Sequence, residues 1–112
     1  MVKYNDALSP VFSALADPTR RAILARLRSG EQTVGELAAP FGVSLPAISK
    51  HLRVLERAGL IRRRITGRTH RCSLDPLPLA SAEEWLAHYR AFWEPRLDSL
   101  ARFIDQPTDE EP

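Results

Sequence analysis

The chain has 112 residues, of which 44% are hydrophobic and 27% are charged, values that are usual for one globular domain. No apolar run approaches the ~20 residues of a membrane-spanning helix and no signal segment opens the sequence, so we expect a cytoplasmic protein. The net charge of +2 is unevenly divided, because residues 1–76 carry 13 Lys and Arg against 6 Asp and Glu, whereas residues 77–112 carry 3 against 8. The first part, at +7, suits a polyanionic partner, and the second part, at −5, does not.

Apolar spacing and capping residues predict three helices in the first part of the chain. Residues 4–15 repeat apolar side chains at helical spacing. Asp17 is a typical N-cap residue for a second helix, which Gly30 ends. Thr33, followed three residues later by Glu36, forms the capping-box pattern that opens a third helix.

Residues 33–61 have the pattern of two helices joined by a tight turn. The small side chain of Ala38 allows the helices to pack closely, and Gly42 can adopt the left-handed conformation that the turn requires. Gly59 terminates the second helix. The pattern is that of a helix-turn-helix, whose second helix, at about residues 44–58, is shaped for the major groove of DNA.

The next segment, residues 61–74, has the pattern of a β-hairpin. Apolar and basic residues alternate from 61 to 65, a turn follows at residues 66–68, and residues 69–74 return as the partner strand. Residues 75–78 are then expected to form a rigid linker. Four helices, a hairpin and a last helix make a mainly α winged helix-turn-helix of order ααααββα, with the hairpin as the wing.

Residues 79–104 are expected to form one long amphipathic helix that Pro95 kinks, because proline deletes a backbone donor. Its aromatic rings, each able to bury roughly 150–250 Å², either form a dimer face or complete the core of the monomer. We expect residues 1–105 to form one DNA-binding and dimerisation domain and residues 106–112 to form an acidic, flexible tail.

Three motifs, in this order and spacing, resemble the ArsR/SmtB family of bacterial repressors. They are DPTRRAIL at residues 17–24, SKHLRVL at 49–55 and AGLI at 58–61, within a similarity that covers roughly residues 8–104. The resemblance implies a homodimeric repressor of its own or a neighbouring gene, which dimerises through its first and last helices. The dimer residues expected on these helices are Leu8, Phe12, Trp85, Tyr89, Phe92, Trp93, Leu97 and Leu100.

The candidate DNA contacts fall into two sets. Helical geometry places the candidate base-reading side chains on the outer, N-terminal surface of the second helix of the pair: Ser44, Leu45, Pro46, Ser49 and Lys50. The candidate backbone contacts are the basic and hydroxyl side chains around it: Thr33, Arg53, Arg62, Arg64, Arg68, Thr69 and Arg71. Arg68, beside the turn of the wing, is placed to enter the minor groove. The alternative is that the hairpin is only a solvated basic surface.

Members of the resembled family often sense metals, but the ligands of their sites are missing from this chain. A cysteine site on the third helix would need a cysteine pair near Ala38 and Pro40. On the last helix, Glu84 and His88 lie one turn apart, and two ligands are too few for a structural zinc site. We therefore predict no metal and no cofactor. The single cysteine, Cys72, is a candidate oxidant sensor or an inert thiol, and the effector is a small organic ligand, a partner protein or none.

Two further classes of function compete with the repressor. The chain could be a winged-helix interaction module that docks its aromatic last helix on a protein partner, with DNA binding secondary. An enzyme has little support, because the sequence shows no Gly-rich phosphate loop, no pairing of a nucleophile with a base and no paired acids in a recognisable context.

Overall fold

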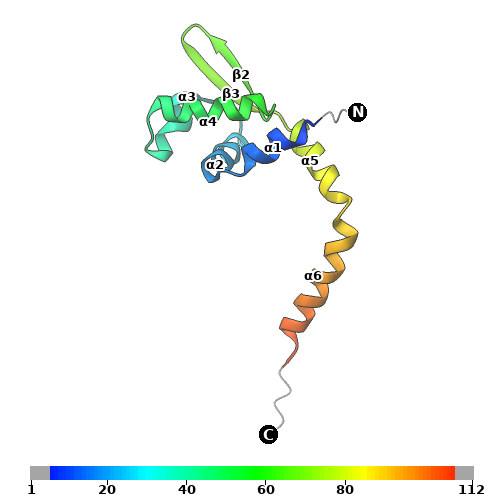
Figure 1. Cartoon of the computed structure of the whole chain (residues 1–112). Coiled ribbons are helices and arrows are strands. Elements are labelled where there is room, and N and C mark those ends of the chain that lie inside the picture. The colour runs from blue at the N-terminus through cyan, green and yellow to red at the C-terminus, as the bar shows by residue number, and fades with distance from the viewer. Residues whose placement is uncertain (1–5, 108–112) are drawn as a thin grey trace. The chain divides into compact units, whose positions relative to one another are not determined.

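The computed structural model describes residues 6–107, which divide into two units, the first ending at Ala82 and the second beginning at Glu83. Within residues 6–107, no helix is long and apolar enough to cross a membrane. The elements, labelled in Figure 1, are α1 (Leu8–Leu15), α2 (Pro18–Leu27), β1 (Gln32–Thr33), α3 (Val34–Ala38), the 3-10 helix η1 (Ala39–Phe41), α4 (Leu45–Arg57), β2 (Ile61–Thr66), β3 (Thr69–Leu74), α5 (Leu77–Ala87) and α6 (Arg90–Asp105). The winged helix-turn-helix order is confirmed. Residues 4 and 5 of the expected first helix and residues 108–112 of the expected tail lie outside the described range.

The helices begin where their capping side chains predict. The carboxylate of Asp17 accepts a hydrogen bond from the backbone N–H of Arg20 at 3.0 Å, which lowers the pKa of that carboxyl. Thr33 and Glu36 form the predicted reciprocal capping box at the start of α3: the Glu36 carboxylate accepts from the Thr33 N–H at 3.2 Å, and this bond lowers the pKa of Glu36. Ser44 caps α4 through its side-chain oxygen.

Two adjacent arginines of α2 close the corner between α1 and α2. The Nε of Arg20 donates to the carbonyl of Ala14 at 2.8 Å, and a terminal nitrogen of the same side chain donates to the carbonyl of Ser13 at 3.1 Å. The Arg21 side chain donates to the carbonyl of Leu15 at 2.7 Å. These three carbonyls end α1, where cations are favoured by the helix dipole and the backbone lacks partners. The paired arginines of the first motif therefore cap the preceding helix.

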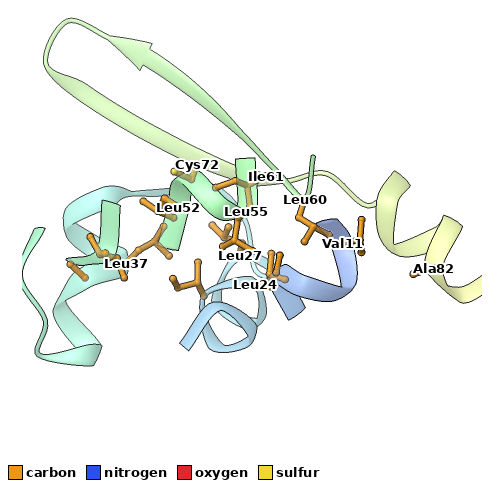
Figure 2. Packing of buried hydrophobic residues seen from close by; sticks show 14 residues of the cluster. Val11, Leu24, Leu27, Leu37, Leu52, Leu55, Leu60, Ile61, Cys72 and Ala82 are labelled. Carbon is orange, nitrogen blue, oxygen red and sulfur yellow. The ribbon is translucent and has the colours of Figure 1, made fainter. Parts of the chain in front are cut away.

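The core is built from α1 to α4, the base of the hairpin and the first half of α5, where Ala82 is buried (Figure 2). On α4, Ile48, Leu52 and Leu55 are fully buried, at the three- and four-residue spacing of one helix face. Leu60 and Cys72 are fully buried as well, and they join the root of the hairpin to this core. Because one face of α4 is completely covered, its opposite face is directed to solvent.

The hairpin is part of a three-stranded antiparallel sheet of order β1-β3-β2. β2 and β3 pair from Ile61 opposite Leu74 to Thr66 opposite Thr69, and Gly67 takes a left-handed conformation in the turn (φ 61°). β1 was not expected, because two residues are too short to show a strand period. It pairs Thr33 with Arg71 and thus fastens the start of α3 to the wing.

The expectation of a single helix over residues 79–104 is wrong. The helix is interrupted at His88 and Tyr89, whose N–H groups bond three residues back at 3.2 and 3.0 Å, as in a 3-10 turn. Pro95 lies inside α6, which continues through it. The kink expected at Pro95 stays a prediction, based on the bond to the Ala91 carbonyl that a proline removes.

The expected rigid linker at residues 75–78 is also shorter than predicted, because α5 begins at Leu77. The carboxylate of Asp75 accepts a hydrogen bond from the Leu77 N–H at 3.1 Å and so satisfies a donor of the first turn. Pro78 fits in this turn because a backbone donor there has no partner within the helix.

Removal of a buried side chain of α4 tests the packing. Leu52→Ala should lower the free energy of unfolding by about 2–5 kcal/mol, because it leaves a cavity under α4. Lys50→Ala, two residues away on the exposed side, should change it by less than about 0.5 kcal/mol. Urea unfolding at one fixed protein concentration measures the free energy of unfolding of each variant. Equal effects of the two substitutions would contradict the assigned orientation of α4.

Candidate nucleic-acid interface

The exposed side of α4 carries one stripe of polar and basic residues. At 3.6 residues per turn, Pro46, Lys50, Arg53 and Arg57 recur along the side opposite the buried face, and all four lie at least partly in solvent. The side chains of Lys50, Arg53 and Arg57 form no hydrogen bond or ion pair with any part of residues 6–107. Three cations on this stripe are therefore available to an outside partner.

A groove of about 510 Å³ lies between α4 and the wing, and we call it the wing groove. It brings together five of the residues predicted to contact DNA, from three separate segments. They are Thr33, Leu45, Ser49, Arg68 and Thr69. The groove is completed by Val34, Gly35, Arg63 and His70. The capping residue of α3, the first turns of α4 and the tip of the wing thus line one concave surface.

Arg63 holds the wing against α4. It donates to one carboxylate oxygen of Glu56 through two nitrogens, at 2.7 and 3.1 Å, and its third nitrogen lies 3.1 Å from Nδ1 of His70. The Arg63 side chain is only 17% exposed. Glu56 belongs to α4, Arg63 to β2 and His70 to β3, so this cluster joins α4 to both strands of the wing. Arg63 thereby has a positioning role, and His70 packs in the same cluster.

Two of the predicted DNA contacts on the wing are engaged with acids. The Nε of Arg62 lies 3.1 Å from the carboxylate of Asp75, and a terminal nitrogen of Arg64 lies 2.7 Å from that of Glu31. Both arginine side chains remain largely exposed. By contrast, Arg68 at the turn forms no side-chain hydrogen bond or ion pair within residues 6–107. The same holds for Arg71 on β3, which is half-buried. The wing thus carries two partly neutralised arginines, Arg62 and Arg64, beside Arg68 and Arg71, which are unpaired within the described residues.

A second groove, of about 380 Å³, lies on the other side of α4, and we call it the basic groove. Its lining consists of Arg20, Lys50, His51, Arg53, Val54 and Arg57. Nδ1 of His51 lies 3.4 Å from a terminal nitrogen of Arg20 and 3.8 Å from the carboxylate of Asp17, so the start of α2 holds this ring. Arg57 was not among the predicted DNA contacts, although its position four residues after Arg53 could have indicated it.

The residues predicted to form a dimer face differ in their surroundings. Leu8 and Phe12, on α1, are half-buried against the core. In the second unit, no residue of α6 is buried, and its large apolar side chains are exposed. The exposed ones are Phe92, Leu97, Leu100, Phe103 and Ile104, while Trp93 is half-buried. Phe103 was missed in the predicted set, although it lies three turns from Phe92 on the same helical face.

Short contacts also order the aromatic residues of the second unit. The rings of Trp85 and Tyr89 have centroids 5.0 Å apart at an interplanar angle of 54°. The guanidinium of Arg96 lies 4.0 Å from the centroid of the Phe92 ring. These contacts do not bury the rings, since Trp85, Tyr89 and Phe92 remain 40%, 48% and 61% exposed.

The groups that could sense a metal or an oxidant are sparse. Within residues 6–107 the structure has no group of three or more His, Cys, Asp or Glu side chains that could hold a metal ion. Cys72 is fully buried, and its burial raises the pKa of the thiol. The reactive thiolate is therefore suppressed, contrary to what an oxidant sensor requires.

Comparisons with known proteins agree with this geometry. A family model described as a helix-turn-helix domain matches residues 15–64. The chain is 43% identical to the HTH-type transcriptional regulator Rv2034 of Mycobacterium tuberculosis over 99 residues, which cover 88% of this chain and 90% of that protein. It is 37% identical to the transcriptional repressor SdpR of Bacillus subtilis over 73% of this chain and 91% of that protein. The crystal structure of an ArsR family transcriptional regulator matches with a TM-score of 0.76 and 46% identity, over 84% of this chain and 97% of that one.

The buried state of Cys72 can be tested by its reactivity. In the folded protein, the thiol should react with an aromatic disulfide reagent much more slowly than in the urea-unfolded chain, because it is buried and its pKa is raised. A control with Cys72→Ser and Ser73→Cys places the thiol on the other face of β3 and should react faster. Equal rates for the folded and unfolded wild-type chain would restore the oxidant-sensing hypothesis.

Proposed function

This chain belongs to the ArsR family of transcriptional regulators, and we propose that it acts as a homodimeric repressor, binding an inverted-repeat operator with α4 and the wing. In this proposal, α4 enters the major groove and the wing reaches the phosphate backbone and the minor groove. Repression follows from occupancy of the promoter, so the protein needs no catalytic step.

The observation that carries the proposal is the set of unpaired cations on the exposed stripe of α4 and at the turn of the wing. Lys50 and Arg53 on α4 and Arg68 on the wing make no side-chain hydrogen bond or ion pair within residues 6–107. They come from two elements that the Arg63–Glu56 pair holds together. A rigid surface with several free cations and hydroxyl groups matches a phosphate backbone, and the same side chains can bond base edges.

Each predicted contact has a distinct role in the proposal. Ser44, Ser49 and Lys50 would bond base edges, while Leu45 and Pro46 would offer apolar contact to a thymine methyl. The backbone would be held by basic and hydroxyl groups around them: Thr33, Arg53, Arg62, Arg64, Thr69 and Arg71. Arg68 would enter the minor groove.

The apolar face of α6 supports the dimer. A helix without any buried residue that exposes five large apolar side chains has an unfavourable surface in water. A second copy of the chain would cover that face, together with Leu8 and Phe12 of α1. The same two-fold symmetry would place two α4 helices in successive major grooves, about one helical turn apart. The interaction-module alternative is not favoured, because it leaves the cations of α4 without a role.

We propose no metal effector, because Ala38 and Pro40 occupy the positions where the metal-sensing members of the family would have a cysteine pair. The effector would instead be a small organic molecule or a partner protein, or the protein would respond only to its own concentration.

The proposed function is tested on the intergenic DNA beside the coding sequence of this protein. The wild-type chain should bind that duplex at least about 10³-fold more tightly than a mixed-sequence duplex. If a dimer neutralises about 6–10 phosphates, the affinity should fall about 10³- to 10⁵-fold between about 50 and 200 mM salt. Lys50→Ala should weaken specific binding, and Arg28→Ala, which removes an equal charge from the exposed end of α2, should not. Salt-independent binding would contradict the proposal.

The ion pairs of the wing should restrain DNA binding. Glu31→Gln removes the partner of Arg64 while keeping the size of the side chain, so Arg64 becomes free to contact a phosphate. The affinity for DNA should rise, by less than about tenfold, because exposed ion pairs are weak. The control Glu94→Gln removes the same charge from α6, where Glu94 pairs with Arg90. Titration of a labelled duplex measures the DNA affinity of each variant. A decrease in affinity for Glu31→Gln would exclude a restraining role of the Glu31–Arg64 pair.

The dimer face can be tested with two charge insertions on α6. Leu100→Glu places a carboxylate on the apolar face and should convert a dimer of the 12.6 kDa chain to a monomer. Ala91→Glu adds the same charge on the opposite face of the helix and should leave the dimer intact. Light scattering at micromolar concentration gives the mass of each variant. A monomeric wild-type protein, or equal effects of both changes, would contradict the proposed face.

A further inference from the structure

A groove lies on each flank of α4, one toward the wing and one toward α2. Going around the helix from the exposed stripe, Leu45 and Ser49 lie toward the wing groove, whereas His51 and Val54 lie toward the basic groove and α2. Lys50, Arg53 and Arg57 belong to the exposed stripe and also line the basic groove. The basic groove is therefore a separate surface, on the flank of α4 that the wing does not reach.

The basic groove is strongly positive. Four permanently charged side chains line it: Arg20, Lys50, Arg53 and Arg57. The carboxylate close to the groove is that of Asp17, which lies 3.8 Å from Nδ1 of His51 and already accepts the backbone N–H of Arg20. The charges thus exceed what the local acid can neutralise, and an anion is the occupant that the groove favours.

The groove is also partly preorganised. The guanidinium of Arg20 is fixed by the carbonyls of Ser13 and Ala14, and its remaining terminal nitrogen lies 3.4 Å from Nδ1 of His51. On the facing wall, Arg53 and Arg57 project from successive turns of α4 and have no partner within residues 6–107. The fixed Arg20 guanidinium lies on one side of the groove and two free arginines lie on the other. This arrangement suits an extended polyanion better than a single small anion.

We propose that the basic groove binds the phosphate backbone at the edge of the major groove opposite the wing, with Arg57 and Arg53 as its contacts. The inference rests on the proposed function. An α-helix with its side chains is about 10–12 Å wide and the major groove is about 12 Å wide, so an inserted helix meets a phosphate backbone on each flank. The wing groove lies on one flank of α4, and the basic groove supplies the matching surface on the other.

The test is the salt dependence of DNA binding by Arg57→Ala, measured on the intergenic duplex and on a mixed-sequence duplex of about 30 base pairs. In the homodimer, Arg57→Ala removes one arginine–phosphate interaction from each of the two subunits. The slope of log affinity against log salt should therefore fall by about 1.8, which is twice the roughly 0.9 of a single phosphate, equally on both duplexes. Arg57→Lys keeps the charge and should retain most of the slope. Arg28→Ala, which removes an equal charge at the exposed end of α2 outside both grooves, should leave the slope unchanged.

Each other outcome overturns the inference. If the wild-type chain binds with a steep slope and Arg57→Ala has the same slope, the basic groove does not hold the backbone, although the proposed function stands. If Arg57→Ala weakens binding to the intergenic duplex alone with an unchanged slope, Arg57 contacts a base instead of a phosphate. If the wild-type chain binds neither duplex with a salt-dependent affinity, the proposed function and this inference both fail.

Discussion

The burial of Ile48, Leu52 and Leu55 fixes the orientation of α4 and, through it, the position of the DNA-binding surface. A helix is rigid, so covering one face fixes the direction of every other side chain on it. The N-cap at Ser44 sets where α4 begins, and the three buried residues set its rotation. A rotation of one residue, about 100°, would expose apolar side chains and bury cations, at a cost of several kcal/mol. The exposed basic stripe is therefore a consequence of the core.

Polar contacts then position the neighbouring elements on this helix. Arg63 links the wing to Glu56, and His51 meets the Arg20 and Asp17 side chains at the start of α2. All of these contacts use the flanks of α4, between the buried face and the stripe. They hold the two grooves in place and leave the cations of the stripe unpaired. The structure thus separates the residues that position α4 from those that are free to bind a partner.

Much of this could be predicted from the sequence, because caps, turns and helical periods are local signals. The residues missed depend on contacts between distant segments. Strand β1 exists only through its pairing with β3, and Glu31 reaches Arg64 across 33 positions. Cys72 is instructive as well: Arg71 is its neighbour in sequence, but adjacent residues of a strand point to opposite faces. Burial therefore dominates and raises the pKa of the thiol, which proximity in sequence did not indicate.

In the proposed function, α4 reads DNA from the major groove, with its buried face turned away from the bases. Methylation protection on the intergenic duplex tests this most directly, because dimethyl sulfate modifies guanine N7 in the major groove. We expect saturating protein to protect guanines in two half-sites about one helical turn apart, and Lys50→Ala to reduce this protection. If the duplex is bound with every guanine N7 still fully reactive, α4 does not occupy the major groove and the account is wrong.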